Sequence, residues 1–184
     1  DRRQKEKLLA EPHSPVQCEQ PVGPDDDACP AFADADARLD EAKGGEQRKL
    51  LFPDAKSFES KSVPSIEGLN SAYQADSGDW VFDVTSANGY HGDVELMVGI
   101  TKDGKIAGIQ TVASNETEGI GTKAISEDYF KTFKDLSASG ELTVDDAASG
   151  QTHVDAVSGA TFSSKAVVEC VNIAISAYSQ MGGN

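Results

Sequence analysis

The residues best suited to hold an anion lie at positions 155–164, just before an apolar helical pattern begins. Gly159 and its small neighbours let a ligand approach the backbone closely. The segment also carries four hydroxyl side chains: Ser158, Thr161, Ser163 and Ser164. Unpaired N–H groups and the helix dipole attract phosphate to a helix N-terminus. Small polar residues before a helix also form simple caps, so this segment alone indicates either a phosphate site or a cap.

Two other glycine-bearing segments could approach a ligand. Residues 115–123 follow a predicted strand and contain Gly119 and Gly121 close together. Residues 88–92 lie between two predicted strands. In isolation each segment is also what an ordinary turn or loop looks like, because glycine supplies backbone conformations that other residues avoid.

Composition and missing motifs exclude several classes of function. The net charge of −15 disfavours nucleic-acid binding and flat adhesion to anionic lipid, although excess acid also simply keeps a protein soluble. No stretch approaches the roughly eighteen apolar residues of a spanning helix. We expect neither direct NAD binding nor an iron–sulfur cluster, because the glycine and cysteine motifs for them are missing. His153 and Asp155 lack an ordered nucleophile, which argues against a hydrolytic triad.

The apolar patterns predict an α+β fold, with a mostly antiparallel sheet flanked by helices. Strands are predicted at residues 69–75 and 80–87, on either side of a turn. The clearest pair is 94–100 and 106–113, since apolar residues recur with period two in the first of these. Gly104 is free to take positive φ in the turn that joins them.

Three helical segments are predicted around this sheet. One lies within residues 37–51, where two glycines interrupt a run of helix formers. The second begins after Ser126, whose hydroxyl can cap it. The third has Ser163 as its expected N-cap and Gly182 or Gly183 as its stop. Helical spacing predicts these residues on its apolar face: Ala166, Val167, Cys170, Ile173, Ala174 and Ala177.

The first part of the chain differs from the rest. Cys18 and Cys29 lie in an acidic, proline-containing stretch with ten residues between them. A disulfide between them would fit an oxidising compartment, and two unpaired cysteines are the alternative. The chain starts at Asp1 rather than Met, which indicates a truncated or processed protein. We therefore expect a lead-in at 1–47, following a removed membrane anchor, and a globular domain at 48–184.

Taken together and in order, the segments resemble the FMN-binding domain found in the G subunit of Rnf-type electron-transport complexes. The same domain occurs in the C subunit of the sodium-pumping NADH:quinone oxidoreductase. The family pattern is Gly-Tyr-x-Gly, an Asp-Gly-type hairpin turn, Glu-Thr-Pro-Gly-Leu-Gly, and Asp-x-x-Ser-Gly-Ala-Thr-x-Thr/Ser before a C-terminal helix. The corresponding positions are 89–92, 103–104, 116–121 and 155–163. The resemblance covers roughly residues 48–180, and Glu118 stands where the family has proline.

The resemblance implies a flavin mononucleotide (FMN) joined through its phosphate to Thr161 by a separate flavin transferase. It further implies an electron-transfer subunit of an ion-translocating ferredoxin:NAD oxidoreductase. That subunit would be anchored to the extracytoplasmic face of the membrane by an N-terminal helix, beside other membrane subunits, and would not be catalytic alone. No catalytic residue and no metal ligand are expected. The expected flavin-binding residues are Thr161, Ser158, Gly159, Ala160, Ser163, Glu116, Thr117, Gly119, Ile120, Gly121, Tyr90 and Lys123.

Several alternatives stay open. Tyr90 could stack on the flavin or be a sheet aromatic, and Lys123 and Lys165 could pair with the phosphate or be solvated. The protein could also be a non-redox extracytoplasmic binding module, which would be colourless, or a standalone flavin reductase, which would turn over alone. An assignment to the quinone-reductase complex also stays possible, although the length and the short N-terminal region favour Rnf.

Overall fold

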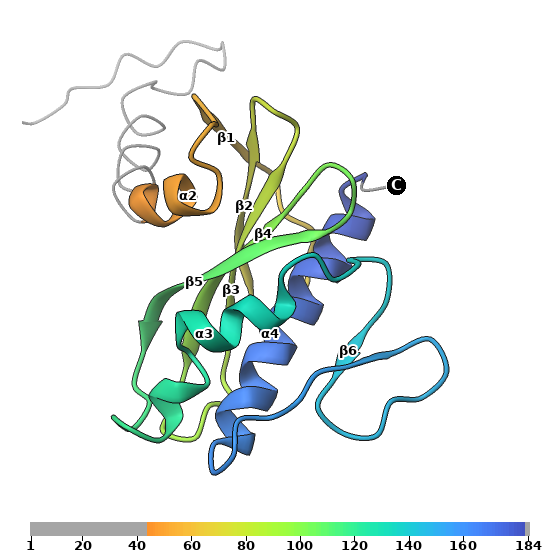
Figure 1. Ribbon diagram of the computed structural model, residues 1–184. Coiled ribbons are helices and arrows are strands. Elements are labelled where there is room, and N and C mark those ends of the chain that lie inside the picture. The colour runs from red at the N-terminus through yellow and green to blue at the C-terminus, as the bar shows by residue number, and fades with distance from the viewer. Residues whose placement is uncertain (1–43, 183–184) are drawn as a thin grey trace, which may run out of the picture.

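The computed structural model describes residues 44–182, so the predicted lead-in and the prediction for Cys18 and Cys29 lie almost wholly outside the described residues. The described part is an α+β domain, as predicted, built on a five-stranded antiparallel sheet with strand order β1-β2-β3-β4-β5 (Figure 1). The elements in chain order are α2 (Gly45–Leu51), β1 (Phe58–Lys61), β2 (Leu69–Ala75), β3 (Trp80–Ser86), β4 (Val94–Ile100), β5 (Ile106–Ser114), η1 (Gly121–Lys123), α3 (Glu127–Phe130), η2 (Lys131–Phe133), β6 (Leu142–Thr143), β7 (Thr152–His153) and α4 (Thr161–Gln180).

The strands β3 and β4 of the main sheet are buried on both faces. The long helix α4 covers one face, where Leu96 and Val98 of β4 belong to the larger core. The short helix α2 covers part of the other face, where Met97 joins a smaller core with Phe52. A Cβ on Gly99 would lie 3.0 Å from the Phe52 ring, so glycine lets this segment sit close to the sheet. The period-two pattern of β4 is therefore confirmed, with apolar contacts on both sides.

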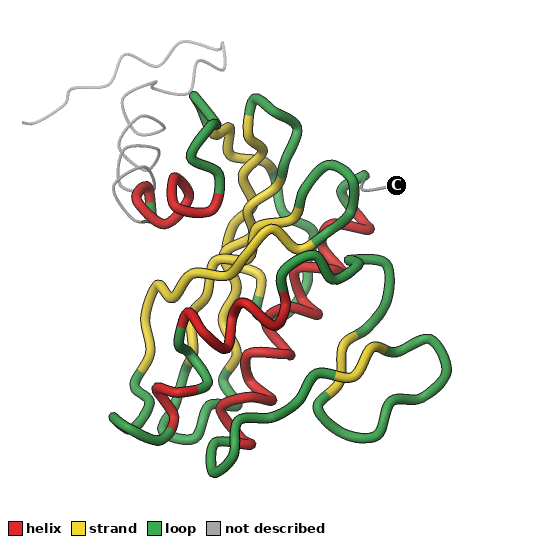
Figure 2. The backbone as a smooth tube through the Cα atoms, in the orientation of Figure 1, coloured by secondary structure: helices red, strands yellow, loops and turns green. Residues whose placement is uncertain are grey.

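The antiparallel register brings two loops to the same end of the sheet. Ser86, the last residue of β3, pairs with Val94, the first residue of β4. Val94 also pairs with Ser114, the last residue of β5. Residues 87–93 and 115–120 therefore leave the sheet side by side, at the lower end of the molecule in Figure 2.

Helix α4 begins at this same end, and polar contacts fix it there. Glu169 accepts hydrogen bonds from the Ser86 hydroxyl and from the Asn88 side-chain amide. One residue further on, Cys170 is fully buried with its Sγ 3.6 Å from the Val94 carbonyl oxygen. Burial raises the pKa of the Cys170 thiol to about 12, so this cysteine is the core residue that its helical position predicts and is not a nucleophile.

The structure corrects the predicted start of the last helix. Ser163 was expected to be its N-cap, but the helix starts at Thr161 and the capping position is Ala160. The reason is a tight turn in which the Ala160 N–H donates to the Val157 carbonyl oxygen at 2.9 Å. Gly159 supplies the positive φ of 79° that this turn needs. Ser163 therefore lies inside the first helical turn.

The other helix predictions have mixed outcomes. Ser126 caps α3, since its hydroxyl accepts from the Tyr129 N–H, although the α-helix gives way to the 3₁₀ turn η2 after one turn. Gly44 has φ 82° and is the N-cap of α2, which begins at Gly45, and the rest of the predicted helical segment, residues 37–43, lies outside the described residues. Gly182 follows the end of α4 with φ 103°, as predicted for a stop. Among the described residues no helix is both long and apolar enough to cross a bilayer.

Candidate functional site

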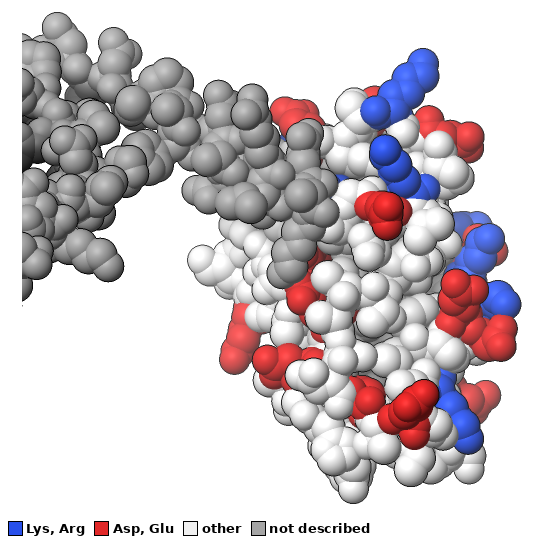
Figure 3. Space-filling model, turned by 90° about the vertical axis from the view of Figure 1, so that its left-hand side faces the viewer, with Lys and Arg blue, Asp and Glu red and all other residues white. Residues whose placement is uncertain are grey.

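A cavity of about 370 Å³ opens at the end of the sheet where the loops and α4 meet. The three glycine-bearing segments all contribute to its walls. The lining residues are Tyr90, Ile120, Gly121, Gly159, Ala160, Thr161, Phe162 and Ser163. None of them is charged. On the face drawn in Figure 3, the lowest part of the molecule shows neither acidic nor basic side chains.

Large apolar side chains stand exposed around this cavity. Tyr90 is 62% exposed, Ile120 53% and Phe162 66%. In the described part of the chain only Leu50 and Val63 are other large hydrophobic side chains with comparable exposure. Hydration of such groups is unfavourable, so their concentration around one hollow indicates a surface that a ligand covers.

Thr161 occupies the first position of the 20-residue helix α4, and its side chain is exposed. The first N–H groups of an α-helix have no intrahelical partner, and no side chain caps this one. The positive end of the helix dipole adds to the attraction for negative charge. A phosphate attached at Thr161 would therefore lie where backbone donors and the dipole both stabilise it.

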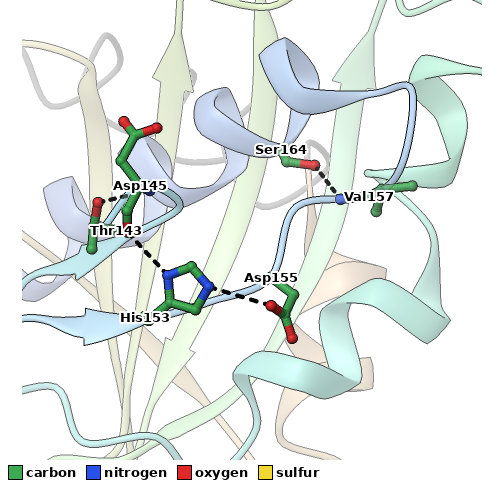
Figure 4. A network of polar contacts seen from close by, with 6 residues as sticks. All are labelled: Thr143, Asp145, His153, Asp155, Val157 and Ser164. Atoms are coloured by element: carbon green, nitrogen blue, oxygen red, sulfur yellow. Dashed lines mark hydrogen bonds and ion pairs between the residues drawn. The ribbon is translucent and has the colours of Figure 1, made fainter. Parts of the chain in front are cut away.

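Polar contacts hold the segment that leads to Thr161. Figure 4 shows the Ser164 hydroxyl directed at the backbone nitrogen of Val157, whose N–H donates to it at 3.0 Å. A Cβ on Gly159 would meet nothing within 4 Å, so glycine is required at this position for its φ and not for space. The hydrogen bond between Val157 and Ser164 therefore ties this turn to the first turn of the helix.

His153 lies upstream of that turn with both ring nitrogens engaged (Figure 4). Nδ1 lies 3.0 Å from the carbonyl oxygen of Asp145, and Nε2 lies 3.3 Å from Asp155 Oδ1. Both partners are acceptors, so the protonated ring satisfies them best. The bond to the Asp145 carbonyl and then the Asp155 carboxylate raise the pKa of His153 above its usual value. These contacts are structural and supply no nucleophile.

Glu116 lies behind the cavity wall. Its Oε1 accepts from the Tyr90 N–H at 2.7 Å, and its Oε2 accepts from the Ser163 hydroxyl at 2.8 Å. The Ser163 proton is thus directed at Glu116.

The other predicted residues divide into two groups. The cavity lining contains Tyr90, Ile120, Gly121, Gly159, Ala160, Thr161 and Ser163. Outside that lining are Glu116, Thr117, Gly119, Lys123 and Ser158. The Thr117 carbonyl accepts from the N–H groups of Ile120 and Thr122, so Thr117 shapes the loop. Lys123 is exposed in η1.

One of the lysines considered as a phosphate partner, Lys165, forms an ion pair outside the cavity. Lys165 pairs with Asp145 at 2.9 Å and does not line the cavity. The structure also places Phe162 in the cavity lining. Sequence reasoning missed this residue because it stands at a variable position of the motif. An aromatic residue among small ones at a helix start is the signal that could have identified it.

Comparison with known proteins agrees with this geometry. The sequence pattern of the FMN-binding domain family matches residues 89–176. The G subunit of the Na(+)-translocating ferredoxin:NAD(+) oxidoreductase complex of Acetobacterium woodii is 30% identical over 152 residues, which cover 73% of each chain. The chain belongs to the family of Rnf G subunits.

Other relatives agree with this membership. The G subunit of the proton-translocating ferredoxin:NAD(+) oxidoreductase complex of Clostridium ljungdahlii is 33% identical over 130 residues, which cover 69% of this chain and 67% of that protein. The fold is similar to a solved structure of the C subunit of Na(+)-translocating NADH-quinone reductase from Parabacteroides distasonis. Its TM-score is 0.56 at 16% identity, over 84% of this chain and 97% of that one. The family's FMN-binding fold is thus the fold of residues 44–182.

Proposed function

We propose that this protein is an electron-transfer subunit that carries FMN bound covalently through its phosphate to Thr161. The observation that carries the proposal is the uncharged cavity with Thr161 on its wall, at the start of a long helix. Residues 48–184 would form the flavin domain, and residues 1–47 its lead-in.

The residues present fit such a group. The exposed rings of Tyr90 and Phe162, with centroids 6.2 Å apart, and the side chain of Ile120 offer apolar contact to a flat ring system. The N-terminus of α4 offers donors to a phosphate. Gly159 and Gly121 bring their backbone into the cavity wall. A bound FMN supplies reversible transfer of one or two electrons, which none of these side chains can supply.

A covalent link would explain why so open a site suffices. With the phosphorus bonded to Thr161 Oγ1, the cofactor cannot diffuse away, so the walls need only orient the ring and limit its contact with water. The linked phosphate would keep one negative charge, which the helix N-terminus offsets. A flavin transferase would make the bond.

The assembly and location are proposed from the relatives. Two relatives at 30% and 33% identity are G subunits of ion-translocating ferredoxin:NAD(+) oxidoreductase complexes. We infer that this chain likewise works within an Rnf-type complex, beside membrane subunits that deliver and accept its electrons. It would lie on the extracytoplasmic face and be held there by an N-terminal anchor.

Intact-protein mass spectrometry tests the attachment. The chain would be coexpressed with a flavin transferase and denatured before measurement, beside Thr161→Ala and Ser158→Ala variants. We expect the mass of one FMN on the wild-type protein and on Ser158→Ala, and none on Thr161→Ala. Ser158→Ala is the matched control, because it removes a nearby hydroxyl outside the cavity lining. No added mass on the wild type, with a transferase active on another substrate, would refute the linkage.

A further inference from the structure

We propose that Glu116 is a positioning residue that joins the three segments of the cavity before any flavin is attached. This inference rests on the proposed function and deepens it, because it names the side chain that shapes the site without touching the ligand. Glu116 stands two residues after the end of β5 and lies outside the cavity lining.

The carboxylate bridges segments that are far apart in the sequence. One oxygen accepts from the Tyr90 N–H at 2.7 Å and the other from the Ser163 hydroxyl at 2.8 Å. Both bonds involve a charged acceptor, which makes them shorter and stronger than neutral ones. Ser163 is 1% exposed, so its bond to Glu116 is shielded from water. One side chain thus connects the 88–92 loop and the start of α4 to the end of β5.

Two glycines make room for this carboxylate. A Cβ on Gly89 would overlap the Gly92 carbonyl oxygen and lie 2.7 Å from Glu116 Oε1, and a Cβ on Gly121 would overlap Glu116 Oε2. Neither glycine has a positive φ, so their backbone conformations are open to other residues. Both positions therefore need glycine for space. Glu116 fills that space at Gly121, and at Gly89 it shares the space with the Gly92 backbone and the Val94 side chain.

These contacts give Glu116 and Ser163 a role distinct from ligand binding. The Ser163 proton is donated to Glu116, so Ser163 acts as one arm of the bridge and does not donate that proton to a phosphate. Without the carboxylate, the Tyr90 N–H and the Ser163 hydroxyl would lose their acceptors. The cavity walls that carry Tyr90 and Thr161 would then move independently.

Amide hydrogen exchange on the unloaded protein tests this bridge. We expect Glu116→Ala to speed exchange about tenfold or more at the hydrogen-bonded amides of the two segments, Tyr90 in 89–92 and Ala160 and Ser164 in 158–164, since hydrogen bonds to charged groups are among the stronger ones. Exchange in the β3–β4 ladder should stay unchanged. Glu118→Ala is the matched control: it removes the same charge from the same loop, and its exposed side chain makes no hydrogen bond or ion pair within residues 44–182. It should leave both segments protected.

Two further variants separate the bridge from general loosening. Glu116→Gln keeps the side-chain length, and its amide can accept from Tyr90 and donate to Ser163, so it should restore most of the protection. Ser163→Ala removes one arm, so residues 158–164 should exchange faster while the Tyr90 amide stays protected. Both variants remain informative if Glu116→Ala does not fold.

Three results would overturn the proposal. They are faster exchange confined to residues 116–122 in Glu116→Ala, an equal effect of Glu118→Ala, or loss of Tyr90 protection in Ser163→Ala. The rate of flavin attachment, followed by mass on the same variants, should fall with Glu116→Ala and recover with Glu116→Gln. The exchange results do not require flavin, so a failure of the bridge and a failure of the attachment at Thr161 are distinguishable.

Discussion

Two hollows lie along helix α4, and their walls differ in kind. The cavity at its N-terminus has no charged lining residue and exposes three large apolar side chains. The hollow on its flank, about 320 Å³, lies against β6 and is rich in polar and charged groups. Several of those groups already have partners: Lys165 pairs with Asp145, and Asn172 bonds the backbone of Leu142.

This difference between the two linings indicates which hollow binds a ligand. In the flank hollow Lys165 and Asn172 bond groups on the opposite wall, and these contacts join α4 to the segment that contains β6. In the N-terminal cavity the apolar side chains of the rim stay largely exposed, although the Tyr90 and Phe162 rings contact each other, and no side chain caps the first N–H groups of α4. The two hollows have similar volumes. They differ in whether the groups that line them already have interaction partners.

The largest effect on stability is expected in the flank hollow. Asn172→Ala removes the acceptor of the Leu142 N–H, at 2.8 Å, and the donor to its carbonyl oxygen, at 2.9 Å. Leu142 is 2% exposed, so we expect a loss of about 1–3 kcal/mol in the free energy of unfolding. Urea unfolding measures it, with Ser176→Ala in the same hollow as a near-neutral control. Flavin attachment should be unchanged, and a marked loss would contradict the division between the hollows.

A smaller effect is expected in the cavity, where a substitution should alter flavin binding and leave stability nearly unchanged. Phe162→Ala should change the free energy of unfolding by less than about 0.5 kcal/mol, because the ring is exposed. It should weaken the contact with the flavin by about 0.5–1.5 kcal/mol, the usual contribution of an aromatic pair. Flavin absorbance and fluorescence on the loaded protein report that change. Leu50→Ala, equally exposed but remote from the cavity, should alter neither spectrum, and an unaltered spectrum in Phe162→Ala would argue against a flavin beside that ring.

The smallest effect is expected at His153, which lines neither hollow. Its contacts with Asp145 and Asp155 raise the pKa of His153 in the folded state. A raised folded pKa adds stability below the unfolded value of about 6.5, and this stability is lost as the pH rises through the folded pKa. The wild-type protein should therefore exceed His153→Gln in thermal midpoint at pH 5, by a margin that shrinks toward pH 8. A margin that grows with pH would contradict this assignment.

Much of the fold could be predicted because it depends on local patterns. The hairpin of β4 and β5 follows from alternating apolar residues and Gly104, which has φ 73°. The apolar face of α4 follows from helical spacing. The start of α4 could not be placed from composition, because hydroxyl residues at several positions can each cap a helix. Hydrogen bonds of Val157 decide it: its carbonyl accepts from Ala160, and its N–H is held by Ser164.

The sequence by itself determined the elements of this protein, its membership of a family, and the three segments that meet at the site. These depend on neighbours in the chain, on residue size and on periodicity. Only the tertiary structure decided that Phe162 lies on the cavity rim and that Glu116 bridges Tyr90 and Ser163 behind the wall. Those relations join residues that are tens of positions apart, and the register of β3, β4 and β5 against α4 creates them.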